Sequence, residues 1–304
     1  MTDPRGDVLV AGASGYLGRH LVSTLHRRGL RVRAVVRDVD RAGGPGAHGA
    51  PALAGLVDEW VACDVVTDRL DGLVRPGETV ISALGVTRQK ADPWDVDFAA
   101  NLALLAEAER APAGQFGYVH VMHAERSRSQ LVRAKRAFVA ALRRSPVPSA
   151  VVNPSGYFSD MEELLAMARR GVAVSLGDGS VRLNPIHGQD LADFLVERLV
   201  ARGTEPPAMD ELGHRHGEWD VGGPEVFTLR EILQLCFAVC DRPARIVDVP
   251  TGLLRAGLPL LRPAARTHDL AQFFLDGFSG DGVGARTGTH RLEDHLRAVE
   301  RGED

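Results

Sequence analysis

A glycine-rich segment near the N-terminus has the residue types needed to hold an anion. Gly12-Ala13-Ser14-Gly15-Tyr16-Leu17-Gly18 follows the apolar run of residues 8–11 and opens a helical pattern over residues 16–28. Glycines here let the backbone turn tightly and approach a pyrophosphate, while the helix N-terminus supplies N–H groups and a favourable dipole. This strand–loop–helix context predicts a dinucleotide site. The expected contacts are Gly12, Ser14, Gly15, Tyr16, Leu17 and Gly18.

The end of the second expected strand bears on the choice of cofactor. An acidic residue there binds the ribose hydroxyls of NAD, whereas this strand ends in Val35-Val36-Arg37-Asp38. Arg37 can pair with a 2′-phosphate as a bidentate donor and stack on the adenine. We therefore predict NADP(H) as the cofactor; Asp38, one place later, keeps NAD(H) as the alternative.

Further contacts with the dinucleotide are expected where other strands end. Asp64 can accept a hydrogen bond from the adenine amino group, or it can simply close a turn. The small residues after the fourth strand let the backbone pass along the ribose and nicotinamide. The predicted contacts at these strand ends are Asp64, Val65, Ala83, Leu84, Gly85 and Pro154.

The alternation of elements predicts the fold that positions these residues. Strands are expected at residues 8–11, 32–36, 59–63, 79–84, 116–122 and 150–153, with helices at 16–28, 97–110 and 130–144. The second crossover is loose, with room for a short helix at residues 51–55. Such βαβ alternation gives an α/β, doubly wound parallel-sheet Rossmann domain. We assign residues 1–154 to it and residues 155–304 to a smaller C-terminal α/β substrate lobe that can return strands to the sheet.

Several motifs, taken together, resemble the atypical short-chain dehydrogenase/reductase superfamily. They are the glycine loop, the strand end at Arg37, residues 81–89, Val96-Asp97 with Asn101-Leu102, Ala134-Lys135, residues 153–161, residues 177–192 and Val221-Gly222-Gly223-Pro224. The resemblance is to the branch that contains divinyl chlorophyllide reductases, isoflavone-reductase-like enzymes and the accessory subunit of respiratory complex I. It covers residues 8 to about 296 and implies the fold and the cofactor, but no particular substrate.

One departure from the superfamily pattern concerns the proton donor. Typical members have a serine after the fifth strand and Tyr-x-x-x-Lys on the next helix; here His120 and Leu131 stand at the serine and tyrosine positions, while Lys135 is present. Lys135 is expected to bind the nicotinamide ribose or to donate a proton itself. His123 and Tyr157, each just past a strand end, are the other candidate acids. His120 is more typical of a buried, hydrogen-bonded histidine.

Composition excludes several classes of function. The 304 residues carry a net charge of −4, which gives no case for binding nucleic acid or an acidic membrane surface, and no apolar stretch reaches the length of a membrane span. Three cysteines show no metal-binding pattern, and we predict no metal. No signal peptide is evident at the N-terminus, so a cytoplasmic protein is expected. A small-molecule substrate is the predicted partner, and a homo-oligomer stays open.

The predicted function is an NADP-dependent oxidoreductase. It reduces a carbonyl or an activated double bond of a small organic molecule, which binds between the carboxyl edge of the sheet and the second lobe. One alternative is a non-catalytic NADP(H)-binding regulatory or scaffold protein, which the absent tyrosine and serine favour. The other is a sugar-nucleotide epimerase or dehydratase that recycles tightly held NAD.

Overall fold

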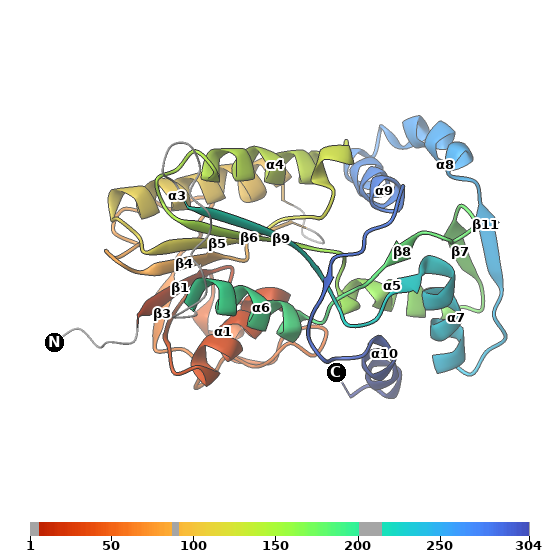
Figure 1. The fold of residues 1–304 in the computed structure, drawn as a ribbon, viewed down its shortest axis with the longest axis horizontal. Helices are drawn as coiled ribbons and strands as arrows, with labels where there is room; N and C mark the ends of the chain where they lie inside the picture. The colour runs from red at the N-terminus through yellow and green to blue at the C-terminus, as the bar shows by residue number, and fades with distance from the viewer. Residues whose placement is uncertain (1–5, 87–90, 201–214, 304) are drawn as a thin grey trace. The chain divides into compact units, whose positions relative to one another are not determined.

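One large parallel sheet organises the computed structural model, which describes residues 6–86, 91–200 and 215–303. Residues 87–89 of the motif quoted above lie outside this range. The sheet order is β12-β9-β6-β5-β4-β1-β2-β3 (Figure 1). Its strands are β1 (Asp7–Ala11), β2 (Arg31–Val36), β3 (Glu59–Ala62), β4 (Thr79–Ser82), β5 (Gln115–Val119), β6 (Ser149–Pro154), β9 (His216–Gly222) and β12 (Ala285–Arg286).

The strand order reverses direction at β1, which confirms the predicted doubly wound topology. β1 pairs in parallel with β2 on one side and with β4 on the other. The crossovers from these two strands leave on opposite sides, and ligands of sheets with this topology bind at the carboxyl ends of such strands. The glycine loop follows β1 and therefore lies at this switch point.

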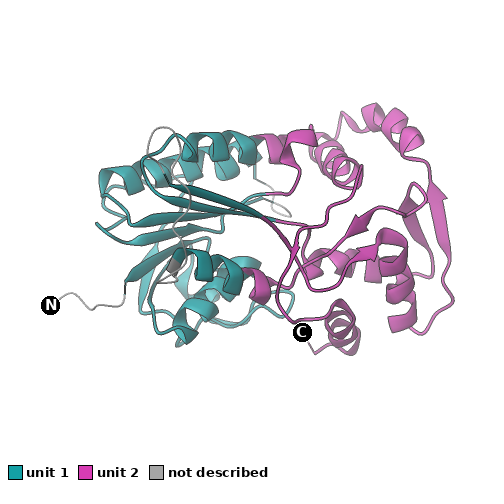
Figure 2. Ribbon diagram, viewed as in Figure 1, with its two compact units in different colours: residues 1–120, 134–153, 192–219 teal, residues 121–133, 154–191, 220–304 magenta. Residues whose placement is uncertain are grey.

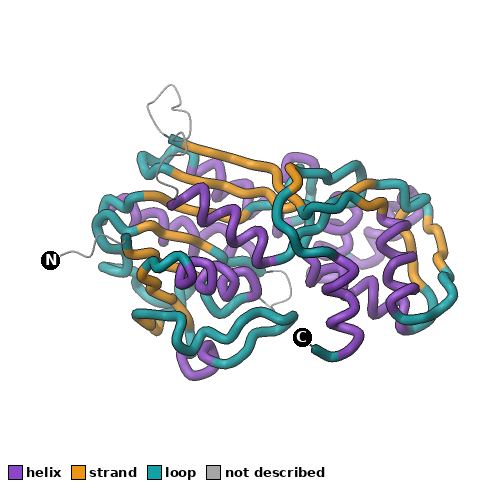
Figure 3. Tube along the Cα trace, turned by 60° about the horizontal axis from the view of Figure 1, so that its bottom comes forward, coloured by secondary structure: helices purple, strands orange, loops and turns teal. Residues whose placement is uncertain are grey.

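Helices cover both faces of the sheet, as Figure 1 and Figure 3 show. On one face, α3 (Asn101–Arg110) and α4 (Gln130–Leu142) pack apolar side chains such as Leu104 and Phe138 against β1, β4 and β5, which contributes Phe116. On the other face lie α1 (Tyr16–Arg27) and α6 (Gly188–Val200). Thr24 of α1 donates a hydrogen bond of 2.7 Å to Asp193 of α6, which ties these two helices together.

The chain divides into two compact units, and neither is a continuous stretch (Figure 2). Unit 1 contains residues 1–120, 134–153 and 192–219, and unit 2 contains residues 121–133, 154–191 and 220–304. The sequence predicted one boundary after residue 154. Residues 192–219 fall in unit 1 because α6 covers the sheet and β9 extends it: the Ser149 N–H donates to the Arg215 carbonyl at 2.9 Å.

Unit 2 is mostly helical and has its own apolar core. Its core helices are α5 (Phe158–Arg169), α7 (Leu229–Val239) and α10 (Leu292–Arg301). A capping box opens α7, where Thr228 and Glu231 exchange hydrogen bonds. The remaining elements are η2 (Ala124–Arg126), β7 (Ala173–Leu176), β8 (Arg182–Leu183), β10 (Phe227–Thr228), β11 (Ile246–Val249), α8 (Thr251–Gly257), η3 (Leu258–Leu261) and α9 (Ala265–Gly277).

Two local predictions differ from the structure. No helix forms at residues 51–55; the short helix of that crossover is α2 (Val39–Gly43), because the Asp38 carboxylate caps it by accepting from the Arg41 N–H at 3.0 Å. The helix expected from residue 97 is preceded by a π-helix, η1 (Trp94–Ala100). Within the described ranges, none of the helices is both long and apolar enough to cross a membrane.

Candidate functional site

The glycine loop is closed by contacts that exclude side chains at two of its positions. Gly12 has φ +76°, and a Cβ there would lie 3.0 Å from the Ala83 carbonyl carbon. A Cβ on Gly18 would lie 2.2 Å from the Gly12 carbonyl oxygen. Because these contacts are with backbone atoms, no change of side-chain rotamer can relieve them. Gly12 thus packs on the β4 loop and Gly18 lets α1 approach the loop, which leaves a cradle of the kind that fits a pyrophosphate.

The start of α1 offers N–H groups to an anion. Its N-cap is Gly15, which has no side chain to accept from the first-turn amides of Tyr16, Leu17 and Gly18. Amides in a first helical turn have no carbonyl of their own helix to bind, and the helix dipole adds positive potential there. Ser14 and Gly15 are exposed, so an anion can reach this end. The residues present therefore fit a dinucleotide.

A buried arginine fixes the outer side of the loop. Arg19 is only 4% exposed and donates to the carbonyls of Ser14 at 3.0 Å, Gly44 at 2.6 Å and Pro51 at 2.9 Å. Three backbone acceptors on one guanidinium hold the glycine loop against the second crossover. The loop is thereby ordered before any ligand arrives, which lowers the entropic cost of binding.

Lys135 lies beside the loop that follows β4. Its Nζ is 3.0 Å from Asp97 Oδ1, and the two side chains are 11% and 0% exposed. Nζ also donates to the Val119 carbonyl at 3.3 Å. A Cβ on Gly85 would meet Asp97 Oδ1 at 3.3 Å and Nζ at 3.4 Å. Gly85 therefore brings its backbone next to a nearly buried ammonium group at the carboxyl end of the sheet.

Asp97 itself is held by the π-helix and by the polar residues around it. Its Oδ2 accepts from the Val86 N–H at 3.2 Å. Asn101 donates to the carbonyls of Val96 at 3.0 Å and Asp97 at 3.3 Å, while Ser82 donates to Asn101 Oδ1 at 2.5 Å. The sequence analysis gave Asp97 no role. It was quoted only within the Val96-Asp97 motif of the family resemblance, and its residue type was no further signal, because Asp95 stands two places before it in the same helix.

Arg37 and Asp38, the two residues on which the predicted choice of cofactor depends, follow β2 and have different surroundings. Arg37 is exposed directly after the strand. The Asp38 carboxylate is engaged as the N-cap of α2. At the end of β3, the Asp64 carboxylate accepts from the Val66 N–H at 3.0 Å, as a turn carboxylate does, and Val65 is buried. Contact of Arg37, Asp64 and Val65 with a cofactor stays a prediction.

Two buried aromatic side chains lie near Lys135 on the fifth strand and just after it. Lys135 Nζ is 5.2 Å from the centre of the Tyr118 ring, and burial raises the pKa of that phenol to about 12. Tyr118 is fully buried, so it lines the ammonium group and does not reach a substrate. His120 is 6% exposed, and burial together with the Lys135 charge lowers its pKa to about 3. It is a neutral, buried histidine at neutral pH.

This histidine makes stability depend on pH. Its pKa falls from an ordinary 6.5 to about 3 on folding, so the unfolded chain binds more protons between those values. Its contribution is constant above pH 6.5 and is lost as the pH falls towards 3. We expect the free energy of unfolding to drop by about 2 kcal/mol from this group between about pH 7 and about pH 5. Urea unfolding at the two pH values measures the drop.

His120→Gln should remove that part of the pH dependence, whatever its effect on stability at neutral pH. His26→Gln, at an exposed position of α1, is the matched control and should leave the slope unchanged. An equal slope in wild type and His120→Gln would contradict the assignment of His120 as a neutral buried group.

The other candidate acids belong to unit 2. His123 precedes η2 with φ +54°, a conformation that few residues other than glycine adopt, and its Nδ1 is 3.8 Å from Glu125 Oε1. Tyr157 precedes α5, and its N–H donates to Asp160 at 3.3 Å. Pro154 is the buried last residue of β6. Lys135 and Asp97 form their pair within unit 1, and the roles of His123, Tyr157 and Pro154 stay predictions.

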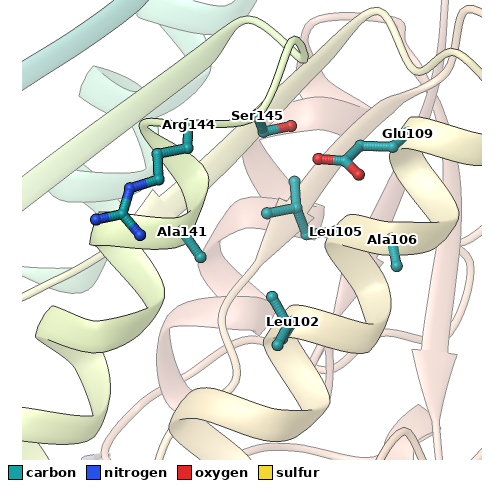
Figure 4. Close-up of a pocket in the computed structure, with 7 residues that line it drawn as sticks. All are labelled: Leu102, Leu105, Ala106, Glu109, Ala141, Arg144 and Ser145. Atoms are coloured by element: carbon teal, nitrogen blue, oxygen red, sulfur yellow. The ribbon is translucent and has the colours of Figure 1, made fainter.

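A shallow groove on unit 1 is separate from these residues. It has a volume of about 250 Å³ and lies between α3 and the end of α4 (Figure 4). Leu102, Leu105 and Ala141 line it, with Glu109 and Arg144 also on its walls. It shares no residue with the glycine loop, the β4 loop or the Lys135 pair, so it is a gap between two helices and not part of the cofactor site.

Comparison with known proteins gives relatives over most of the chain. Residues 12–201 match the family described as NAD(P)H-binding. A chloroplastic divinyl chlorophyllide a 8-vinyl-reductase of Oryza sativa subsp. indica is 28% identical over 285 residues, which cover 88% of this chain and 67% of that protein. A ceramide reductase of Caulobacter vibrioides is 32% identical over 267 residues, covering 84% of this chain and 78% of that protein.

The fold is also found among solved structures. An NADPH-dependent quinone oxidoreductase of Escherichia coli, solved with NADPH, superposes with a TM-score of 0.73 over 96% of this chain and 99% of that one, at 15% identity. The sequence matches, the doubly wound sheet and the glycine cradle agree on one family. The chain belongs to the NAD(P)H-binding atypical short-chain dehydrogenases/reductases.

Proposed function

We propose that this protein is an NADPH-dependent reductase of a carbonyl or an activated carbon–carbon double bond in a small organic molecule. The observation that carries the proposal is the Lys135–Asp97 pair, 3.0 Å apart and nearly buried beside Gly85. A buried charge is costly unless it is paired. A lysine held in this way at the carboxyl end of the sheet is more readily explained by chemistry at that edge than by stability alone.

Each part of the site has a definite task in this proposal. The α1 N-terminus holds the pyrophosphate, and the backbone from Ala83 to Gly85 lies along the ribose. Lys135 has a fixed position, from which its ammonium group binds the ribose or gives the substrate the proton that follows the hydride, while Asp97 orients it. The bound cofactor supplies the hydride, and the protein supplies position and charge.

The preference for NADPH rests on the end of β2. Arg37 is exposed there and can meet a 2′-phosphate with two N–H groups. Asp38, the residue that would favour NAD, already accepts the cap hydrogen bond from Arg41 at 3.0 Å. The Asp38 carboxylate is thus engaged in capping α2, whereas Arg37 has no ion pair with a carboxylate among the described residues.

The test is to follow cofactor binding and turnover in the same preparation. NADPH and NADH are titrated by fluorescence against wild type and Arg37→Ala, and oxidation of each is measured with a panel of aldehydes, ketones, quinones and enones. We expect Arg37→Ala to weaken NADPH binding by on the order of 10- to 100-fold, as for the loss of a charged hydrogen bond, and to leave NADH unchanged. Arg28→Ala, another exposed arginine, is the matched control.

A second candidate is a nucleotide-binding scaffold without turnover. It is favoured by Leu131, a buried leucine at the position where relatives of the typical kind carry the tyrosine acid. Tight NADPH binding with no turnover on any acceptor would support the scaffold against the reductase. Equal binding of NADH and NADPH, unaffected by Arg37→Ala, would reject the NADPH assignment.

A further inference from the structure

Unit 2 exposes an apolar segment that its core does not use. Among the described residues, five of the eleven exposed large hydrophobic side chains fall between residues 253 and 274, and Leu260 is 82% exposed. The core of this unit is built from α5, α7 and α10 and takes no side chain from α8, η3 or α9. The exposed members are Leu253, Leu260, Leu261, Leu270 and Phe274.

The same segment is basic in an otherwise acidic chain. Residues 249–268 contain Arg255, Arg262 and Arg266 and no aspartate or glutamate, although the whole chain has 40 acidic residues against 36 basic ones. All three arginines are exposed. Arg255 and Arg262 make no ion pair with any carboxylate in the described part of the chain. Exposed leucines interspersed with arginines complement a surface that is apolar inside and negative outside.

The segment is firmly attached to the fold on its other side. Leu258 and Leu275 are buried. Asp269 of α9 accepts from the N–H groups of Gln130 at 2.5 Å and Leu131 at 3.2 Å, which caps the start of α4. Asp276 accepts from the Arg128 N–H at 2.7 Å. Leu260, Leu261, Leu270 and Phe274 are therefore presented by elements that are anchored through Leu258 and α9, and α8 with Leu253 directly precedes them in the chain.

We propose that residues 251–274 form a docking surface for an anionic lipid bilayer. Leu253, Leu260 and Leu261 enter the boundary between headgroups and acyl chains, and Arg255, Arg262 and Arg266 bind lipid phosphates. Exposed apolar side chains next to basic ones can bind the membrane surface in this manner without spanning the bilayer. The net charge of −4 does not argue against this binding, because attraction to anionic lipids depends on the protein charges that lie within a Debye length of the membrane surface. The proposal does not depend on the reductase assignment.

The test is sedimentation of the full-length protein with vesicles of phosphatidylcholine alone or mixed with phosphatidylglycerol. We expect binding to the mixed vesicles that weakens with added salt. Replacing Arg255, Arg262 and Arg266 together by glutamine should lower the partition coefficient by on the order of 100-fold, since each basic residue near the surface contributes about fivefold. Leu253→Ser/Leu260→Ser/Leu261→Ser should lower it by on the order of 10-fold or more.

Two matched controls separate docking from general charge and hydrophobicity. Arg28→Gln/Arg133→Gln/Arg242→Gln removes the same charge from exposed positions elsewhere, and Val66→Ser/Leu102→Ser removes exposed apolar groups from unit 1. Both should bind like wild type. The proposal is overturned if wild type does not sediment with anionic vesicles, or if the leucine variant binds as well as wild type. It is equally overturned if the leucine variant changes only the oligomeric state in analytical ultracentrifugation, which would make the patch a self-interface.

Discussion

Replacing Lys135 by methionine is expected to lower kcat/KM for the reduction reaction by on the order of 10²- to 10⁴-fold, the usual contribution of a positioned proton donor. The physical reason is the loss of the ammonium group that Asp97 Oδ1 holds at 3.0 Å beside Gly85. Steady-state kinetics with NADPH and an accepted substrate measure the effect, and NADPH titration shows how much of it comes from cofactor binding.

The same substitution is expected to destabilise the fold, because it leaves the fully buried Asp97 without its counter-charge. Breaking one side of a buried ion pair costs about 3–5 kcal/mol. Lys135→Met/Asp97→Asn removes both charges, so it should recover most of this stability. It should recover none of the activity. This divergence separates the role of Lys135 in the reaction from its role in folding.

Arg133→Met serves as the matched control, because it is an exposed position on the same helix. It should change neither stability nor kcat/KM appreciably. Full activity in the double variant would show that the pair is only structural and that another group supplies the proton, with His123 and Tyr157 next in line. A double variant no more stable than Lys135→Met would show that the loss of stability does not come from the uncompensated charge of Asp97.

Sequence patterns predicted the glycine loop that the structure shows between β1 and α1, because its conformation is set by backbone. The glycine loop is set by residues adjacent in the chain, so its strand, turn and helix can be inferred from local chemistry. Lys135 could be singled out as one of two lysines among 36 basic residues. Asp97 could not, since its importance comes from a contact 38 positions away and from a π-helix that no periodicity predicts.

The division of the chain into two units was also harder to infer, because it depends on contacts between residues far apart in the sequence. β9 reads His-Gly-Glu-Trp-Asp-Val-Gly, with no apolar alternation, and joins the sheet by pairing with β6. Its Glu218 accepts a hydrogen bond from Asn153 at 3.0 Å and forms an ion pair with Arg143. Polar contacts thus help to hold β9 in the sheet, whereas the central strands are held by apolar packing. Likewise, the whole-chain net charge of −4 gives no indication that residues 251–274 form a basic segment with exposed apolar side chains.

Two alanine substitutions in the glycine loop are expected to destabilise the fold to different degrees and to share an effect on NADPH binding. In Gly18→Ala the new Cβ would lie 2.2 Å from the Gly12 oxygen and 2.8 Å from Ala13 Cα, so the backbone must shift. We expect a loss of about 3 kcal/mol in the free energy of unfolding and no measurable NADPH binding. In Gly15→Ala the nearest atom is 3.3 Å away.

Gly15→Ala should therefore fold, with a loss of less than about 1 kcal/mol at this N-cap position. Its methyl group adds bulk at the exposed N-cap of α1, where the pyrophosphate is expected, and we expect NADPH binding to weaken by on the order of 10- to 100-fold, as for one charged hydrogen bond. Urea unfolding and NADPH fluorescence measure the two effects, and Gly257→Ala, which meets nothing within 4 Å, is the control. If Gly15→Ala bound NADPH normally, the anion would not lie at the start of α1. The assignment of every strand-end contact would then have to change, because all of them are placed relative to that anion.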